Sequence, residues 1–228
     1  MSTASIGSEV AAALRVYVVR HGIVGRPGER KVPDPRWARE DPRLLPVGRR
    51  MAEAVGRRLA AEALDYPLRI VASPLWRTSE TAQLIAEALE TRFCVEPGMM
   101  EICLPPMHAA FRGLTPQEAG LVFDRLENPE ALLGSWWPAA PETRESCRAR
   151  VAATLDRLLP RWQAEGVRGV VLVGHGASTD AAVAHLAGLE DCPGGHDLCG
   201  VSQLDLFGYA PPARLGAVNC QKHLAHLV

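Results

Sequence analysis

Two histidines and two arginines stand at the ends of three short apolar runs, far apart in the sequence. The runs are RVYVVRHG at 15–22, LRIVASPLWR at 68–77 and GVVLVGHG at 169–176. Short β-branched runs closed by glycine or proline predict buried strands. Polar side chains therefore follow each predicted strand directly, with His21 after the first and His175 after the third.

If these strands are adjacent and parallel, their carboxyl ends bring Arg20, His21, Arg77 and His175 together, because ligands of open α/β sheets bind beyond those ends. Two arginines suit a phosphate group, whose oxygens match the planar guanidinium fork. The arginine charges lower the pKa of His21 and leave a neutral imidazole that can attack phosphorus. His175 and the backbone N–H groups from Gly176 onward would then donate to the phosphoryl oxygens.

The elements between these runs predict how the site is held. Apolar periodicity predicts helices at 46–64, from Ser73 to about residue 89, at 142–162 and at 178–186, with further strands at 92–95 and 201–207. Ser73 is the expected N-cap of the second helix, which places Arg77 in its first turn. This alternation predicts an α/β protein, a three-layer α/β/α sandwich with a mostly parallel central sheet.

At 228 residues the chain is expected to form a single domain, with a loose tail at 1–14 and an ordered polar surface loop at 23–45. The irregular, proline-rich segment 105–141 is expected to be a cap insertion over the carboxyl ends of the strands. Its neighbouring Trp136 and Trp137 are expected to pack within that cap.

Composition excludes several classes of partner. The formal net charge is −1, so neither nucleic acid nor an anionic membrane is expected as a partner. The first fifteen residues do not resemble a signal peptide and no apolar run is long enough to span a membrane, which predicts a cytoplasmic protein.

Six cysteines without a C-x-x-C pair are expected to be reduced thiols. Cys192, His196 and Cys199 could supply three metal ligands from one loop. Loop and core thiols beside a Gly-Gly turn are the preferred interpretation, so no metal and no cofactor are expected.

The motifs as a set resemble the histidine phosphatase superfamily, the phosphoglycerate-mutase-like proteins. The matching segments are VVRHG at 18–22, SPLWRTSETAQLIA at 73–86, VEPGMMEI at 95–102 and LVGHGAS at 172–178. VEPGMMEI and ETRESCRARV are most similar to the branch that contains the Sts phosphatase domains and ecdysteroid-phosphate phosphatase. That branch has an arginine where this chain has Val24, and the mutases have an asparagine where it has Pro27.

The resemblance implies a phosphohistidine intermediate on His21 and a proton donor at Glu101, which by residue type alone would be a solvated loop carboxylate. It also allows a homodimer. Arg26 and His108 are weaker candidates for binding a second anionic group of the substrate. A solvated loop is the alternative for each of them.

The expected activity is metal-independent hydrolysis of a small-molecule phosphomonoester. One alternative is a non-catalytic module that recognises phosphate, although binding alone would not require Glu101. The other is a phosphomutase of the phosphoglycerate mutase type, which the substitution at Pro27 disfavours.

Overall fold

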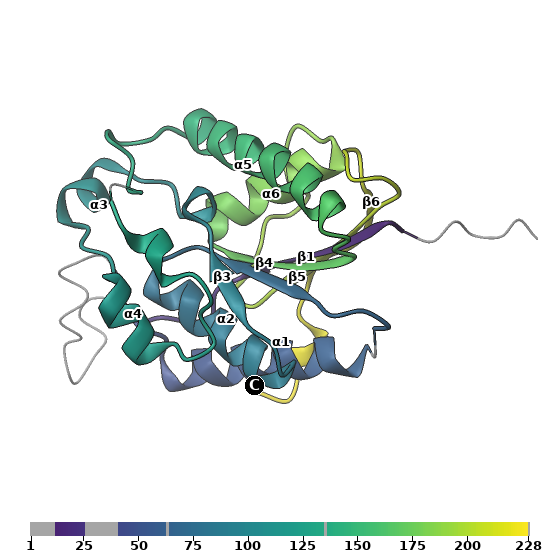
Figure 1. Cartoon of the computed structure of the whole chain (residues 1–228), viewed down its shortest axis with the longest axis horizontal. Coiled ribbons are helices and arrows are strands. Elements are labelled where there is room, and N and C mark those ends of the chain that lie inside the picture. Colours follow the sequence, from purple (N-terminus) through teal and green to yellow (C-terminus); the bar gives the residue numbers. More distant parts are fainter. Residues whose placement is uncertain (1–11, 26–40, 63, 135, 228) are drawn as a thin grey trace, which may run out of the picture.

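The computed structural model describes residues 12–25, 41–62, 64–134 and 136–227, and it is built on one six-stranded sheet. The strand order is β3-β2-β4-β1-β5-β6 (Figure 1). The strands span Leu14–Arg20 (β1), Arg69–Ala72 (β2), Phe93–Val95 (β3), Gly169–Gly174 (β4), Val201–Leu206 (β5) and Arg214–Cys220 (β6). The pairs β2–β3, β2–β4 and β1–β4 are parallel, whereas β1–β5 and β5–β6 are antiparallel.

Helices cover both faces of this sheet. Helices α1 (Pro46–Ala61) and α2 (Trp76–Ala88) lie on one face, and α5 (Arg144–Ala164) and α6 (Gly176–Ala187) lie on the other (Figure 1). Alternate residues of β1 divide between the two cores: Tyr17 packs on the α1 side and Val18 on the α5 side, as strand geometry requires. The predicted three-layer α/β/α sandwich is therefore confirmed.

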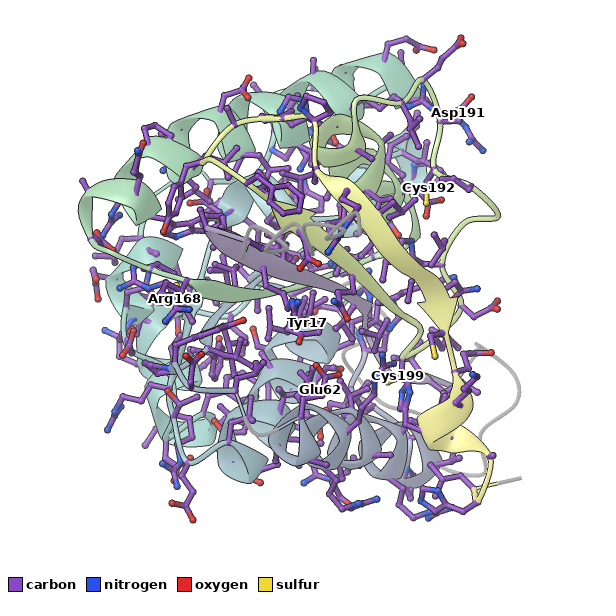
Figure 2. All side chains as sticks on the ribbon, turned by 90° about the vertical axis from the view of Figure 1, so that its right-hand side faces the viewer. Tyr17, Glu62, Arg168, Asp191, Cys192 and Cys199 are labelled. Carbon is purple, nitrogen blue, oxygen red and sulfur yellow. The ribbon has the colours of Figure 1, made fainter. Side chains whose placement is uncertain are left out.

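Polar contacts tie the layers together at particular points. The Tyr17 hydroxyl donates to the carboxylate of Glu62, the residue that follows α1, so the centre of the sheet is joined to the end of that helix (Figure 2). Burial and this carboxylate both raise the pKa of Tyr17. The phenol thus stays a neutral donor.

The predicted helix start at Ser73 is wrong. Helix α2 begins at Trp76, and the backbone N–H of Trp76 donates at 2.6 Å to the carboxylate of Asp41, a buried residue from the loop before α1. Ser73 instead continues the extended backbone of β2, since its N–H donates to the Val173 carbonyl at 2.9 Å. A carboxylate from a distant loop serves the helix end, and the Ser73 hydroxyl is left for another contact.

The predicted boundary between the amino-terminal tail and the first strand differs slightly from the observed one. Leu14, placed in the predicted tail, is fully buried in β1, while residues 1–11 lie outside the described part of the chain. Most of the predicted surface loop, 26–40, also lies outside it. Within the described residues, no helix is both long and apolar enough to cross a membrane.

The segment predicted as a cap folds against the sheet edge. It contains α3 (Pro105–Ala110), α4 (Pro116–Val122) and the 3-10 turn Pro129–Leu132. Leu126 pairs with Phe93 of β3, and the Phe123 ring meets the Trp76 ring edge to face at 5.5 Å. The expected packing of the two tryptophans is confirmed: they contact each other and Phe111, which stacks on Trp137 at 3.6 Å. That the segment covers a substrate remains a prediction.

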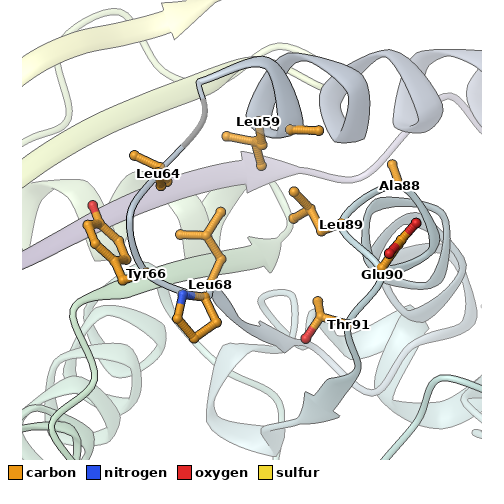
Figure 3. A pocket seen from close by; sticks show the side chains of 10 residues that line it. Leu59, Leu64, Tyr66, Leu68, Ala88, Leu89, Glu90 and Thr91 are labelled. Carbon is orange, nitrogen blue, oxygen red and sulfur yellow. The ribbon is translucent and has the colours of Figure 1, made fainter.

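One pocket lies at the end of the sheet opposite the strand carboxyl ends (Figure 3). It opens between the last turns of α1 and α2, beside the segment that enters β2. Its lining is mostly apolar, including Leu59, Leu64, Leu68 and Leu89, and Glu90 is the only charged residue among the described residues that line it. This pocket lacks the basic groups that a phosphate would need.

Candidate active site

The strand register brings the three predicted strand ends together. Arg20 of β1 pairs with Gly174 of β4, and Ala72 of β2 pairs with Val173 of the same strand. The His21 N–H continues the ladder by donating to the Gly174 carbonyl at 3.0 Å. The His21 and His175 rings consequently lie 5.2 Å apart, edge to face.

His21 is held in one tautomer. Its Nδ1 lies 2.7 Å from the carbonyl oxygen of Gly22, so Nδ1 carries the proton and Nε2 carries the lone pair. The side chain is buried, and this burial together with the charges of Arg77 and Arg20 holds its pKa well below the usual 6.5. Nε2 is therefore an unprotonated nitrogen at neutral pH.

Gly22 allows the chain to turn closely against α1. A Cβ atom at Gly22 would lie 2.5 Å from the Gly48 carbonyl oxygen, and one at Gly48 would lie 2.2 Å from the Ile23 carbonyl oxygen. Both distances exclude a side chain without a backbone shift. The Gly22 N–H also donates to Thr81 Oγ1 of α2 at 3.1 Å, which fixes the peptide next to His21.

His175 is fully buried and is held by Ser73. Its Nε2 lies 2.8 Å from Ser73 Oγ, which itself accepts the Leu75 N–H at 3.5 Å. This contact holds the ring, with Ser73 Oγ as donor or acceptor according to the tautomer of His175. Burial, Arg77 and His21 lower the pKa of His175, and Nδ1 has no hydrogen-bond partner in the described structure.

Arg20 and Arg77 supply the positive charge. Arg20 donates from one terminal nitrogen to the His196 carbonyl at 2.8 Å, whereas its buried Nε lacks a partner among the described residues. Gly176 lies against this guanidinium, with a Cβ position 3.6 Å from Cζ. Arg77 is buried in the first turn of α2, as expected, and its charge acts on both histidines.

Glu101 lies at the amino end of α6, the helix that follows His175. Its Oε1 accepts the N–H of Ala177 at 3.2 Å and that of Ile102 at 3.0 Å. For Oε2, the described residues provide no hydrogen-bond donor. Glu101 is thus a positioned carboxylate rather than a solvated one.

Arg150 of α5 fixes the backbone that carries Glu101. Its guanidinium donates to the carbonyl oxygens of Gly98 at 2.8 Å, Met100 at 3.1 Å and Glu101 at 3.3 Å. Nε and Nη2 of the same guanidinium donate to the Glu142 carboxylate, each at 2.7 Å. Sequence reasoning missed this role, although Arg150 is part of the segment ETRESCRARV.

The weaker candidates are not joined to this cluster by a described contact. His108 Nε2 lies 2.9 Å from the carbonyl oxygen of Pro138, so the ring ties α3 to its own segment. Arg26 falls outside the described residues. For both, a role in binding substrate stays a prediction.

Cys192, His196 and Cys199, which the sequence offered as three possible metal ligands, do not gather at one point in the structure. Cys199 is buried in the core beneath the α1 face, whereas Cys192 packs on the α6 side of the sheet (Figure 2). Asp180 takes the place of Cys199 in the group, beside Cys192 and His196.

Several known proteins are similar to this chain. It is 27% identical over 177 residues, 77% of this chain and 76% of the relative, to a probable phosphoglycerate mutase, GpmB, of Yersinia enterocolitica. Among solved structures, a mycobacterial glucosyl-3-phosphoglycerate phosphatase bound to VO3 is 24% identical with a TM-score of 0.59, covering 91% of this chain and 99% of that one. Ecdysone phosphate phosphatase from Bombix mori, bound to tungstate, has a TM-score of 0.68 at 18% identity, covering 91% and 93%.

These structures share the fold, and they include a phosphatase of the ecdysteroid-phosphate branch that the motifs resemble. The family model for the histidine phosphatase superfamily (branch 1) matches residues 16–215, which covers all five candidate catalytic residues. The chain therefore belongs to the histidine phosphatase superfamily.

Proposed function

We propose that this protein is a phosphatase that hydrolyses a small-molecule phosphomonoester through a phosphohistidine on His21. Family membership makes the chain a phosphatase or a phosphomutase. The observation that carries the proposal is the pair of buried nitrogens without hydrogen-bond partners among the described residues, Arg20 Nε and His175 Nδ1, next to the unprotonated His21 Nε2. Buried nitrogens need a partner, and a phosphoryl group offers several acceptor oxygens to Arg20 Nε–H and to an N–H of His175.

The first step transfers the phosphoryl group to the protein. His21 Nε2 attacks phosphorus while the bond from phosphorus to the ester oxygen breaks, and Arg20, Arg77 and His175 stabilise the charge on the phosphoryl oxygens. Glu101, in its protonated form, gives its proton to the departing alkoxide. The products are the free alcohol and phosphohistidine.

The second step returns the enzyme to its starting state. The Glu101 carboxylate takes a proton from a water molecule, whose oxygen attacks phosphorus as the bond to His21 Nε2 breaks. Inorganic phosphate leaves, and Glu101 is again protonated for the next ester. Every charge in both steps is met by a side chain or backbone group, so we propose that the reaction needs no metal.

A phosphomutase is the second candidate, because GpmB, the relative with 27% identity, is named a probable phosphoglycerate mutase. A mutase would return the phosphoryl group to a second hydroxyl of a retained product. We rank it below hydrolysis, since the mutase asparagine position is occupied by Pro27.

The buried site bears on the size of the substrate, and the free cysteines bear on the location of the protein. A phosphomonoester that reaches His21 must be small enough to enter a cluster whose histidines are buried, which favours a small molecule over a phosphoprotein. All six cysteines are free thiols, which suits the expected cytoplasmic location.

The test is phosphate release from a panel of phosphomonoesters in excess EDTA, with wild type and His21→Ala in parallel. We expect release by wild type alone, and the order of esters will define the substrate class. Activity that EDTA abolishes and added metal restores would contradict a metal-independent reaction. Transfer of phosphate to an added alcohol in preference to water would instead identify a mutase.

A further inference from the structure

A second polar cluster lies behind Arg20, outside the phosphate site. It joins Asp180 of α6 to Cys192 and His196 of the loop that follows this helix, and their ligand atoms all lie within 4.8 Å of one another. His196 Nδ1 is 2.9 Å from Asp180 Oδ1 and 3.8 Å from Cys192 Sγ. Gly194 and Gly195, with φ of 75° and 67°, turn the loop back so that Cys192 and His196 face the same point.

Ser202 holds the second nitrogen of the His196 ring and so fixes the orientation of the ring. Its side chain is fully buried, and Nε2 lies 2.7 Å from Ser202 Oγ, which also accepts the Asn219 N–H. A histidine that binds a metal usually makes such a hydrogen bond with its second nitrogen, which points the first at the ion. Nδ1 lies at hydrogen-bond distance from the Asp180 carboxylate and carries the proton of that bond, so binding of an ion at Nδ1 would release this proton to solvent while Nε2 donates to Ser202.

We propose that Asp180, Cys192 and His196 bind a divalent zinc-type ion. One sulfur, one imidazole nitrogen and one carboxylate oxygen form a donor set that suits Zn²⁺, with a fourth position open to water. A small cleft that reaches Asp180 and Cys192 provides the route of entry, and it is also lined by Arg144 and by Arg148, which is ion-paired with Asp191. Figure 2 shows Asp191 and Cys192 together at the edge of the molecule.

The bound ion acts on the loop that holds Arg20. The His196 carbonyl accepts from the Arg20 guanidinium at 2.8 Å, and the Cys199 N–H donates to the Arg20 carbonyl at 3.0 Å. The same loop therefore holds both the side chain and the backbone of Arg20. An ion that joins the loop to α6 would add to the support that these hydrogen bonds already give Arg20, so the reaction itself would not depend on the ion.

The test is a titration of reduced, metal-free protein with Co²⁺, an optical substitute for Zn²⁺, in the His21→Ala background so that the active-site imidazole cannot contribute. We expect one equivalent to bind with a thiolate-to-cobalt charge-transfer band that added Zn²⁺ removes. Cys192→Ser should lose the band, and Cys220→Ser, which changes a half-buried cysteine of β6, should keep it. No saturable band in the parent protein, or a band that survives Cys192→Ser, would overturn the proposal.

The Asp180→Asn variant tests whether the ion has three protein ligands or only Cys192 and His196. Asp180→Asn should weaken Co²⁺ binding at least about tenfold, because a neutral amide is a poorer ligand than a carboxylate. Unchanged affinity in this variant would overturn the three-ligand site. Circular dichroism of each variant shows that the fold is retained.

Discussion

Two buried histidines lie on either side of Arg20, and their surroundings differ. His175 has one nitrogen on Ser73 and the other without a described partner. His196 has both nitrogens engaged within the protein, by Asp180 and by Ser202. Arg20 shows the same contrast within one side chain, since a terminal nitrogen is bound to the His196 carbonyl while Nε is unpaired among the described atoms.

This difference separates a site for a ligand from its support. Leaving a buried donor without an acceptor costs about 1–3 kcal/mol, so such atoms are rare unless a ligand completes them. We propose that the phosphoryl group of the substrate completes those on the His175 side, Arg20 Nε and His175 Nδ1. On the His196 side Asp180 and Ser202 hold the ring, the proposed ion would enter by replacing the hydrogen bond to Asp180, and the loop supports Arg20.

The largest effect is expected from the nucleophile. His21→Ala should reduce turnover to the background rate, because no other nitrogen lone pair is presented at the same point. Steady-state phosphate release measures this. His185→Ala, which alters a histidine bound to Asp156 near the surface, is the matched control and should keep wild-type activity. Turnover by His21→Ala would contradict the assignment.

Glu101→Gln should show the next largest effect, and it should depend on the leaving group. Removal of a general acid lowers rates by about 10²–10⁴-fold when the alkoxide needs a proton. Alkyl phosphates should therefore slow far more than p-nitrophenyl phosphate, whose phenolate leaves without one. A comparison of kcat for the two esters measures this, and equal slowing would remove Glu101 as the acid.

The serine partners of the two histidines, Ser73 and Ser202, should respond differently to substitution. Ser73→Ala should lower kcat by roughly five- to 150-fold, which corresponds to about 1–3 kcal/mol for the lost bond that orients His175. Ser202→Ala should instead lower the free energy of unfolding by a similar amount and reduce kcat far less. Paired kinetics and urea denaturation measure both. Equal losses of kcat would erase the proposed difference.

The smallest effect concerns pH. The pKa values of His21 and His175 lie below the usual 6.5, so below that pH the unfolded chain binds protons that the native protein does not. The free energy of unfolding should therefore fall as the pH drops from about 7 to about 5. Urea denaturation at several pH values should show a shallower fall for His21→Ala, and an equal slope would contradict a lowered pKa for His21.

Local patterns predicted the parts of the site that belong to strand ends. Arg20, His21 and His175 follow apolar runs, and the position of Arg77 depends only on a helix that begins soon after Pro74. The parallel pairing of β4 with β1 and with β2 then brings these residues together.

Contacts between distant segments escaped prediction. Asp41 serves the start of α2 and Arg150 holds the Glu101 backbone, and each joins residues at least 35 positions apart. Ser73 was expected to be a supporting donor as well as a helix cap, but its partner, His175, could not be named from the sequence. Glu101 could be chosen only through the family resemblance, since its own neighbours carry no distinctive pattern. Asp180 likewise reaches Cys192 and His196 through the packing of its helix rather than through sequence spacing.

The central claim is that His21 Nε2 carries the phosphoryl group between the two steps. Rapid quenching during turnover of a labelled phosphomonoester, followed by peptide mapping under alkaline conditions, tests it directly. We expect an acid-labile label on the peptide that contains His21, absent from His21→Ala. Turnover without any labelled protein, or a label on another residue, would contradict it.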